Sequence, residues 1–506
     1  MNKARFRPVL IILSALLLTA CSAPVAAPVP AQAPVAAPVP APAAATTGAV
    51  ASAEAAAVPF VGKLAVEPKE GNAGTEVTAT GSGLPANTPL QLNWTTVDGS
   101  WILKGDFQEE FHGRDYKERA INLAAVQTDA GGSFQARFKA PAGFGFDHNV
   151  SVVDPATGKL LTRTNFFVKM QVSMLNASGP QGTPINFDIK GIGYKAYENS
   201  WVVLYDNKVT GWVPSVLSGG NAQFSIPATG APGRHQIVIN HGWASVGYLN
   251  PSQTPAAGQR AWYFEFTITP GAPVLPAPAE TQGLKPEPGV APGGTGAAVW
   301  TDPATGPINT PVRLLARGLT PGAAVELTWW RMVGNRVAGQ WKQNSVSLGK
   351  ATVAADGTLA LEFKAPDDLG GAHRIEAAVG DKVVATGSFT LTPSVLAIAP
   401  QQVKAGQQFE VHLKGVGWTE TANIYTLVYD NAYVGFGCGF SSQGDVTINL
   451  PAAGEPGLHY VDLYPAIYKG EDAAGVYNFR TPMLTGDKEH PHERLPIFHL
   501  AFAVTD

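Results

Sequence analysis

The fold class is indicated most clearly by residues 74–84, which read Gly74-Thr75-Glu76-Val77-Thr78-Ala79-Thr80-Gly81-Ser82-Gly83-Leu84. Within it, the apolar side chains of Val77 and Ala79 alternate with Thr78 and Thr80. Successive side chains of a β-strand point to opposite faces, so this alternation predicts a strand with one buried face and one solvated face. The stretch therefore favours a β-sheet with a core on one side.

Similar short runs recur along the chain. Leu90–Trp94 alternates in the same way, and the turn Asp129-Ala130-Gly131-Gly132 precedes a third alternating run, Ser133–Phe138. Runs rich in Val, Thr and Phe are broken by Gly, Pro, Asn and Asp, and no long stretch keeps a helical period. Strands at this spacing, with turn signals between them, predict an all-β chain of sandwich modules.

The chain also repeats itself. Lys190-Gly191-Ile192-Gly193-Tyr194 matches Lys414-Gly415-Val416-Gly417-Trp418, and Tyr205-Asp206-Asn207 matches Tyr429-Asp430-Asn431 at the same offset. The segments before them match as well, as Phe138-Lys139-Ala140-Pro141 does with Phe363-Lys364-Ala365-Pro366. Self-similarity at a fixed offset indicates repeated structural units. We therefore predict a duplication of two kinds of module, in the order A1-B1-A2-B2.

The expected divisions follow from the repeats and from composition. They are a signal peptide (1–20), an anchor and Ala/Pro-rich tether (21–60), module A1 (61–168), module B1 (169–270), a Pro/Gly-rich linker (271–296), module A2 (297–392) and module B2 (393–506). The tether is almost wholly Ala, Pro and Val, a composition that forms no core. The linker is expected to divide the folded part into two halves.

The modules resemble bacterial immunoglobulin-like domains of the IPT/TIG kind, on their length, a proline-glycine turn and the strand end Gly81-Ser82-Gly83-Leu84. The resemblance implies four tandem immunoglobulin-like β-sandwiches, with Trp94 and Trp329 in the core positions. The Cys…Trp…Cys pattern of antibody domains is absent. This fold carries many unrelated functions, so the resemblance bears mainly on architecture.

The N-terminus carries an export signal. Lys3, Arg5 and Arg7 precede the apolar run Val9–Leu18, which is too short to span a bilayer. Leu18-Thr19-Ala20-Cys21 follows and resembles the lipobox of bacterial lipoproteins. The resemblance implies cleavage before Cys21 and a diacylglyceryl (palmitate-type) lipid on its thiol. The protein would be extracytoplasmic, on the outer membrane of a diderm host or the outer face of a monoderm's cytoplasmic membrane.

Composition limits the function classes. Hydrophobic residues make up 45% and charged residues 15%, which is typical of a globular chain. The net charge of −4, without a basic block after the signal, argues against a nucleic-acid partner. The chain has two cysteines, so lipidation of Cys21 would mean that Cys438 forms no disulfide within the chain. Its thiol would be a buried small side chain, an intermolecular link or a metal ligand.

The sequence contains no nucleophile elbow, phosphate loop, zincin helix or EF-hand loop. His148, His235, His373 and His459 recur at matching places on expected strands, which favours structural roles. One insertion, in A1 from Ile102 to Ala120, mixes charges with aromatic side chains. It predicts either a solvated loop packed on a neighbouring module or a binding loop. The residues of that candidate binding loop are Trp101, Phe107, Phe111 and Tyr116.

A second insertion lies in B2, from about Tyr468 to Leu495, and contains Asp487-Lys488-Glu489-His490-Pro491-His492-Glu493. Imidazole and carboxylate groups at this density suit zinc or calcium. The candidate metal ligands are Asp487, Glu489, His490 and His492, with Cys438, His459, Asp462 and His499 in the same module. The alternative is a charged exposed loop without metal, so that the chain needs no cofactor.

These features lead us to expect a non-enzymatic, membrane-anchored protein of the binding or adhesion type. Its ligand would be a cell-wall polysaccharide, another surface protein or a host surface. Two alternatives remain open at this point. One is a structural envelope spacer without a ligand, and the other is a metal-dependent hydrolase that uses the B2 insertion.

Overall fold

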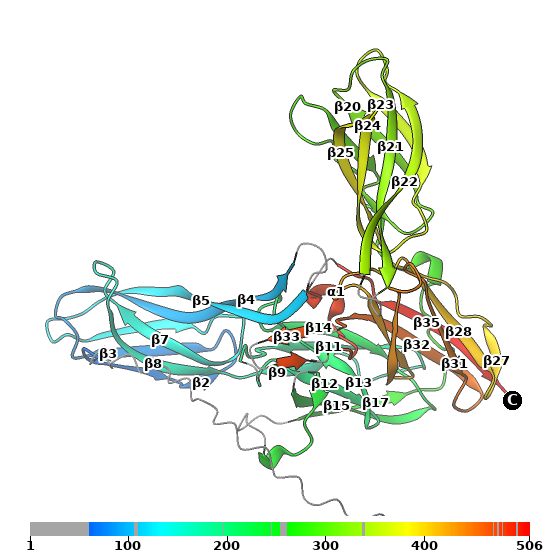
Figure 1. Ribbon diagram of the computed structural model, residues 1–506. Helices are drawn as coiled ribbons and strands as arrows, with labels where there is room; N and C mark the ends of the chain where they lie inside the picture. Colours follow the sequence, from blue (N-terminus) through cyan, green and yellow to red (C-terminus); the bar gives the residue numbers. More distant parts are fainter. Residues whose placement is uncertain are drawn as a thin grey trace, which may run out of the picture. The chain divides into compact units, whose positions relative to one another are not determined.

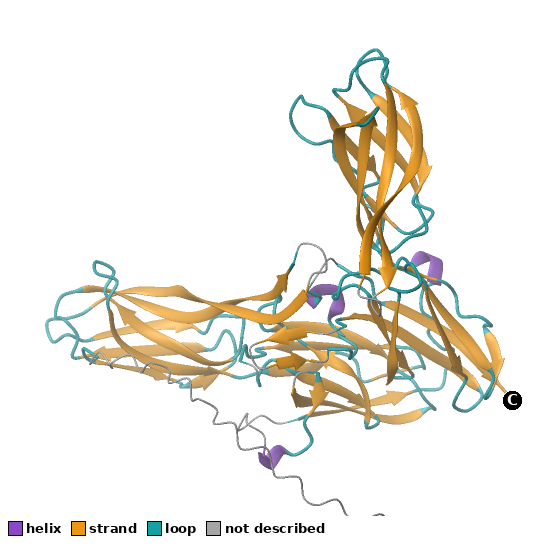
Figure 2. Cartoon of the chain, viewed as in Figure 1, coloured by secondary structure: helices purple, strands orange, loops and turns teal. Residues whose placement is uncertain are grey.

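A computed structural model describes residues 60–105, 110–195, 197–243, 245–253, 261–335, 340–468, 470–472, 475–477, 479–491 and 494–506. The expected signal peptide, Cys21 and the tether up to residue 59 lie outside the described residues. Phe60–Asp506 forms a compact unit of its own. In the described part, no helix has the length and apolar character needed to span a bilayer. Strands dominate the drawing in Figure 2.

Module A1 is a sandwich of two sheets (Figure 1). The first sheet has the order β1 (Lys63–Glu67), β3 (Glu76–Ser82), β6 (Phe134–Lys139). The second has the order β2 (Glu70–Gly71), β8 (Leu160–Val168), β7 (Phe146–Val153), β4 (Pro89–Lys104), β5 (Glu110–Gln127). Val77 and Ala79 of β3 are fully buried and Thr80 is exposed, as the alternation predicts.

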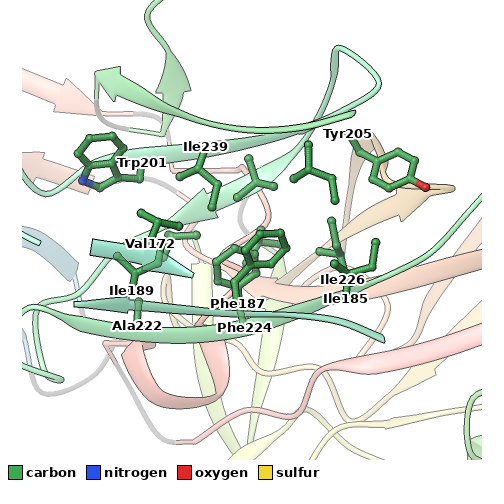
Figure 3. Close-up of a cluster of buried hydrophobic side chains, with 14 of the residues drawn as sticks. Val172, Ile185, Phe187, Ile189, Trp201, Tyr205, Ala222, Phe224, Ile226 and Ile239 are labelled. Atoms are coloured by element: carbon green, nitrogen blue, oxygen red, sulfur yellow. The ribbon is translucent and has the colours of Figure 1, made fainter. Parts of the chain in front are cut away.

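Module B1 has the same plan. Its first sheet has the order β14 (Asn221–Pro227), β11 (Pro184–Lys190), β9 (Gln171–Met174). The second has the order β10 (Ser178–Gly179), β17 (Trp262–Ile268), β15 (Gly233–Trp243), β12 (Trp201–Tyr205), β13 (Lys208–Val213), with β16 (Val246–Gly247) paired to β15. A 3-10 turn, η1 (Pro251–Gln253), follows β16. Figure 3 shows the core between the sheets, where the rings of Phe187 and Phe224 stack at 5.0 Å.

Module A2 follows the linker, which contains the 3-10 turn η2 (Ala279–Thr281). Its sheets have the orders β18 (Ala298–Asp302), β20 (Pro311–Arg317), β23 (Leu359–Lys364) and β19 (Thr305–Gly306), β25 (Lys382–Leu391), β24 (Gly371–Val379), β21 (Ala324–Asn335), β22 (Gln340–Thr352). Trp329 of β21 and Trp94 of β4 are both buried, in the core positions expected for them.

Module B2 has the sheets β26 (Ser394–Val395), β28 (Gln408–Lys414), β31 (Val446–Pro451) and β27 (Gln402–Lys404), β35 (Phe498–Thr505), β32 (Gly457–Ala466), β29 (Ile424–Tyr429), β30 (Ala432–Cys438). Its insertion contains the hairpin β33 (Gly470–Asp472) and β34 (Gly475–Tyr477), and the single helical turn α1 (Gly486–Glu489). In every module, the second sheet begins with a short strand paired in parallel to the module's last long strand. The chain is therefore all-β, with sandwiches of the immunoglobulin-like kind.

The repeated Asp-Asn pairs form the turns that the sequence predicts. Tyr205 pairs with Lys208 across a two-residue turn, so Asp206 and Asn207 are its central residues. Their φ angles are 47° and 62°, and the matching Asp430 and Asn431 have 45° and 59°. A two-residue hairpin of this type needs positive φ at both central positions, which Asp and Asn tolerate.

The insertion in A1 is a hairpin and not a loop. β4 and β5 stay paired as far as Lys104 and Glu110. The charged run Lys117-Glu118-Arg119 is exposed on β5, the edge strand of its sheet. Charged side chains are common on edge strands because one side of such a strand faces water. The charge density that suggested a loop is therefore compatible with a strand.

Candidate functional site

Three modules meet in one buried cluster, which we call the three-module junction. It consists of Trp101, Leu103 and Phe111 from A1, Val202, Leu204 and Trp212 from B1, and Ile467, Phe479 and Met483 from B2. The ring of Phe111 lies 5.1 Å from that of Phe479, which lies 5.8 Å from that of Trp212. Each of the three is less than a tenth exposed. The insertions of A1 and B2 therefore build a core that neither module has alone.

Main-chain hydrogen bonds reinforce this junction. The N–H of Trp212 donates to the carbonyl of Pro482 at 2.8 Å, and the N–H of Leu484 donates to the carbonyl of Trp212 at 2.9 Å. On the A1 side, the guanidinium of Arg114 donates to the carbonyl of Asn199 at 2.6 Å. The B2 insertion thus adds a short parallel bridge to β13, the edge strand of B1.

Glu489 closes the junction. Its carboxylate accepts the backbone N–H groups of Val216 (2.7 Å), Leu217 (2.9 Å) and Ser218 (2.7 Å), all in the B1 loop after β13. The indole N–H of Trp101 donates to the carbonyl of the same glutamate at 2.7 Å. Glu489 is only 1% exposed, and burial raises the pKa of its carboxyl although the three N–H bonds oppose that shift.

The candidate binding loop therefore needs correction. Trp101 and Phe111 belong to the three-module junction. The ring of Tyr116 packs edge-on against Phe144 of A1 at 5.7 Å and lies 5.8 Å from Tyr194 of B1. Phe107 lies outside the described residues. The three described aromatics contact neighbouring modules, which is the alternative interpretation of this insertion, and they do not form an exposed aromatic surface.

The structure gives the candidate metal ligands different surroundings. Both carboxylate oxygens of Glu489 accept backbone N–H groups of B1. His490 is 4% exposed beside it, Asp487 lines a cavity described below, and His492 lies outside the described residues. The described residues contain no group of three or more acidic, histidine or cysteine side chains placed to hold a metal ion.

His459, Asp462 and His499, the other histidine and acidic candidates of B2, belong to two separate pairs. Nδ1 of His459 lies 2.6 Å from Oδ2 of Asp430, and the pKa of His459 is raised because this carboxylate outweighs the effect of burial. Nδ1 of His499 lies 2.7 Å from Oδ1 of Asp462, and this carboxylate likewise overcomes burial and raises the pKa of His499. Cys438 ends β30 with an exposed side chain, which corrects the expectation of a buried thiol.

The four repeated histidines have the structural roles that their repetition predicts. His148 and His373 stack on Trp94 and Trp329 at 4.6 and 4.3 Å, deep in the A-type cores. Nε2 of each lies 2.8 Å from the carbonyl oxygen four residues earlier. His235 in B1 repeats the pattern of His459, with Nδ1 2.7 Å from Asp206. Each histidine ties a strand to the turn before it.

The linker does more than separate two halves. The N–H of Val274 donates to the carbonyl of Gln181 in B1 at 2.8 Å, and the hydroxyl of Tyr460 in B2 donates to the carbonyl of Val274 at 3.0 Å. Gln282 then exchanges two hydrogen bonds with the main chain of His499, at 2.6 and 2.7 Å. The linker therefore connects B1 directly to B2, which its proline-rich composition did not predict.

Two cavities open between β14 of B1 and residues 494–499 of B2, and we call this region the B1–B2 seam. The larger cavity measures about 530 Å³ and the smaller about 310 Å³, and Ser225 and His499 line both. The polar side chains of the larger cavity are those of Asn186, Gln223, Ser225, Tyr464, Asp487, Arg494 and His499. Sequence patterns predict Asp487 and His499 only as part of a metal site within B2, and they do not predict this cavity, because its residues come from two modules and the linker and share no motif.

No protein-family model matches the chain, and no curated protein matches it. Among solved structures, Salmonella α-2-macroglobulin reacted with methylamine is 9% identical over 88% of this chain, with a TM-score of 0.18, and this chain spans 31% of its length. Invasin, a bacterial integrin-binding protein, is 9% identical over 84% of this chain and 79% of its own, with a TM-score of 0.18. The D0–D1 region of intimin is 12% identical over 37% of this chain and 97% of its own, with a TM-score of 0.14. TM-scores and identities this low give no information on the function of the chain. Its fold is assigned from the sheets described above.

Proposed function

We propose that this chain is a lipid-anchored, extracytoplasmic binding protein that holds its ligand in the B1–B2 seam. The observation that carries the proposal is the larger seam cavity, which at about 530 Å³ has the size typical of ligand sites. Polar groups from both modules converge on it, among them Asn186 from β11, Gln223 from β14 and Arg494 from B2. Convergent polar groups in a cavity are the usual means of orienting a ligand.

The surroundings of the seam support this role. The three-module junction fixes the B2 insertion to B1 near one end of β14, and Gln282 and Val274 of the linker connect the same modules beside the smaller cavity. A binding site gains affinity when its walls are held in place before the ligand arrives. An envelope spacer needs only length and stiffness, and that role gives no reason for a polar cavity between two modules.

A hydrolase is less consistent with the geometry. Catalysis needs acids and bases that converge on one reacting atom. Here Asp430 and Asp462 are each bonded to a different histidine, and Glu489 is bonded to backbone N–H groups. Asp430, Asp462 and Glu489 are therefore engaged in separate structural contacts, and of the acidic candidates in the B2 insertion only Asp487 lines the larger cavity.

The lipid anchor is part of the proposal and rests on the sequence Leu18-Thr19-Ala20-Cys21. The C21A variant, expressed in a bacterial host, is expected to move from the membrane fraction to the soluble extracytoplasmic fraction. Mass spectrometry of the native N-terminal peptide should detect a diacylglyceryl group on the cysteine. An unmodified Cys21 in a membrane-bound protein would contradict the anchor.

Binding itself is tested with residues 60–506, which form a compact unit. The immobilised protein is exposed to separate glycan and protein fractions of isolated cell envelopes, and retained material is measured with and without soluble protein as competitor. We expect one fraction to be retained and to be displaced by the competitor. If neither fraction is retained, the spacer role replaces the binding role.

A further inference from the structure

The edge of β14 faces the seam. β14 pairs with β11 on one side, and no strand of the described part pairs with it on the other. An edge strand presents unpaired N–H and C=O groups, to which another extended chain can add. An added chain could pair only with those residues of β14 whose N–H and C=O groups point away from β11.

The hydrogen-bond pattern identifies those residues. The N–H of Ala228 donates to the carbonyl of Thr183 at 2.9 Å. Ser225 lies opposite Asn186, whose carbonyl already accepts the N–H of Leu175, the residue after β9. Residues of an antiparallel pair alternate between bonding to the partner strand and pointing away from it. Gln223 and Ser225 therefore direct their N–H and C=O groups away from β11, toward the free edge.

The two ends of this edge are closed, but its middle is open. At one end the side-chain amide of Asn431 donates to the carbonyl of Pro227 at 2.7 Å. At the other end the hydroxyl of Ser215 donates to the carbonyl of Asn221 at 3.0 Å. Within the described residues, the outward N–H and C=O groups of Gln223 and Ser225 have no protein partner, and both residues line the larger cavity.

Two polar side chains from B2 that line the larger cavity also lack a hydrogen-bond or ion-pair partner among the described residues. The hydroxyl of Tyr464 is buried and lacks a hydrogen-bond partner in the described part of the chain, although the residue is only 1% exposed. A buried unpaired hydroxyl costs free energy, so it favours a partner supplied by a ligand. Arg494 lines the same cavity and is exposed, without an acidic partner among the described side chains.

We propose that the seam binds an extended peptide, which adds as a strand to β14 and places an acidic side chain against Arg494. This inference rests on the proposed binding function and names its ligand class. Gln223 and Ser225 offer two N–H and two C=O groups in the order and spacing of a strand, with about 6.8 Å between alternate residues. Another extended main chain repeats that order and spacing, whereas the hydroxyls of a glycan do not. Strand addition of this kind takes its affinity from main-chain bonds and its selectivity from side-chain contacts.

The test uses residues 60–506 as the target for a phage-displayed library of linear peptides. Enriched peptides, made synthetically, are measured against the S225P variant, because proline removes one outward N–H and is tolerated on an edge strand. The matched control is N449P. Asn449 is exposed on β31, the strand of B2 that corresponds to β14, at the corresponding position. We expect at least a tenfold loss of affinity for S225P and no change for N449P.

A second variant keeps the test decisive if S225P fails to fold. R494E changes an exposed side chain and leaves β14 intact, and it should lower the affinity for the acidic peptides at least tenfold. Equal peptide affinities for the native protein and a folded variant would overturn the proposal, and so would a library that yields no enriched peptide. If an envelope glycan is retained in that last case, the binding function stands and the peptide assignment alone fails.

Discussion

Removal of the Glu489 side chain should detach the B2 insertion from B1. In the E489A variant, the N–H groups of Val216, Leu217 and Ser218 lose their shared acceptor. The loss occurs at the three-module junction, where the same insertion also contributes the main-chain bridge to Trp212. The expected result is a folded protein whose modules A1, B1 and B2 keep their own cores while the insertion opens.

The size of the destabilisation depends on how deeply the three N–H groups that Glu489 accepts are buried. A buried N–H without an acceptor costs about 1–3 kcal/mol. The N–H of Val216 lies in a buried hydrogen bond and should incur most of that cost, while the bonds from Leu217 and Ser218 are partly buried, so water replaces part of what those two donors lose. Burial raises the pKa of Glu489, so removing its charge recovers part of the penalty. The net cost to docking is then about 3 kcal/mol, or about a hundredfold in the docking equilibrium.

Amide hydrogen exchange at Trp212 and Leu484 measures this directly, because their N–H groups form the bridge and do not touch Glu489. Both amides should exchange about a hundredfold faster in E489A. The E489Q variant keeps the shape and one acceptor, so its effect should be smaller. The control is E455A, an exposed glutamate of B2. Unchanged exchange at Leu484 in E489A would refute the assignment of Glu489 to docking.

Three further predictions test other contacts. The W212A variant leaves a cavity in the three-module junction and should lower the free energy of unfolding by about 3–5 kcal/mol, measured by urea unfolding. A loss no larger than that of an alanine substitution at an exposed position would contradict the place of Trp212 in the core. The N431A variant should lose about 1–3 kcal/mol more stability than N207A, because the two residues occupy corresponding turns of B2 and B1 but only Asn431 donates to Pro227; equal melting temperatures would count against that bond. The raised pKa of His459 means that its pair with Asp430 stabilises B2 fully below about pH 6.5 and loses this effect as the pH rises through the folded-state pKa. The D430N variant should abolish that decline in melting temperature, and a decline that persists in D430N would assign it to another group.

Local patterns were sufficient for the architecture. The alternation of Val77 and Ala79 predicts β3, and the Asp-Asn pairs predict the turn after β12 and after β29, because both depend on neighbouring residues alone. The resemblance to immunoglobulin-like domains implies a core position for Trp94, and the residue is buried. The duplication remains an inference from the sequence offsets, with which the shared strand order is consistent.

Contacts between modules could not be predicted in this way. Glu489 stands in the charged run Asp487–Glu493, which favours an exposed loop or a metal site. Its burial depends on backbone N–H groups at residues 216–218, whose direction is set by the fold of another module.

The contacts of the linker could not be predicted from its sequence either. Its prolines cannot donate hydrogen bonds, but Val274 donates its N–H to B1 and accepts from Tyr460 of B2 with its carbonyl. The side-chain amide of Gln282 bonds to the main chain of His499 in B2.

A saturation isotherm on isolated cell envelopes tests whether the B1–B2 seam is a binding site. Labelled residues 60–506 are titrated onto envelopes in three forms: native, S225W, which fills the seam from β14, and N449W, which places the same bulk at the matching position of β31. We expect saturable binding for the native protein and N449W, and at least a tenfold weaker isotherm for S225W. Equal isotherms for S225W and N449W, or no saturable binding by the native protein, would contradict binding in the seam.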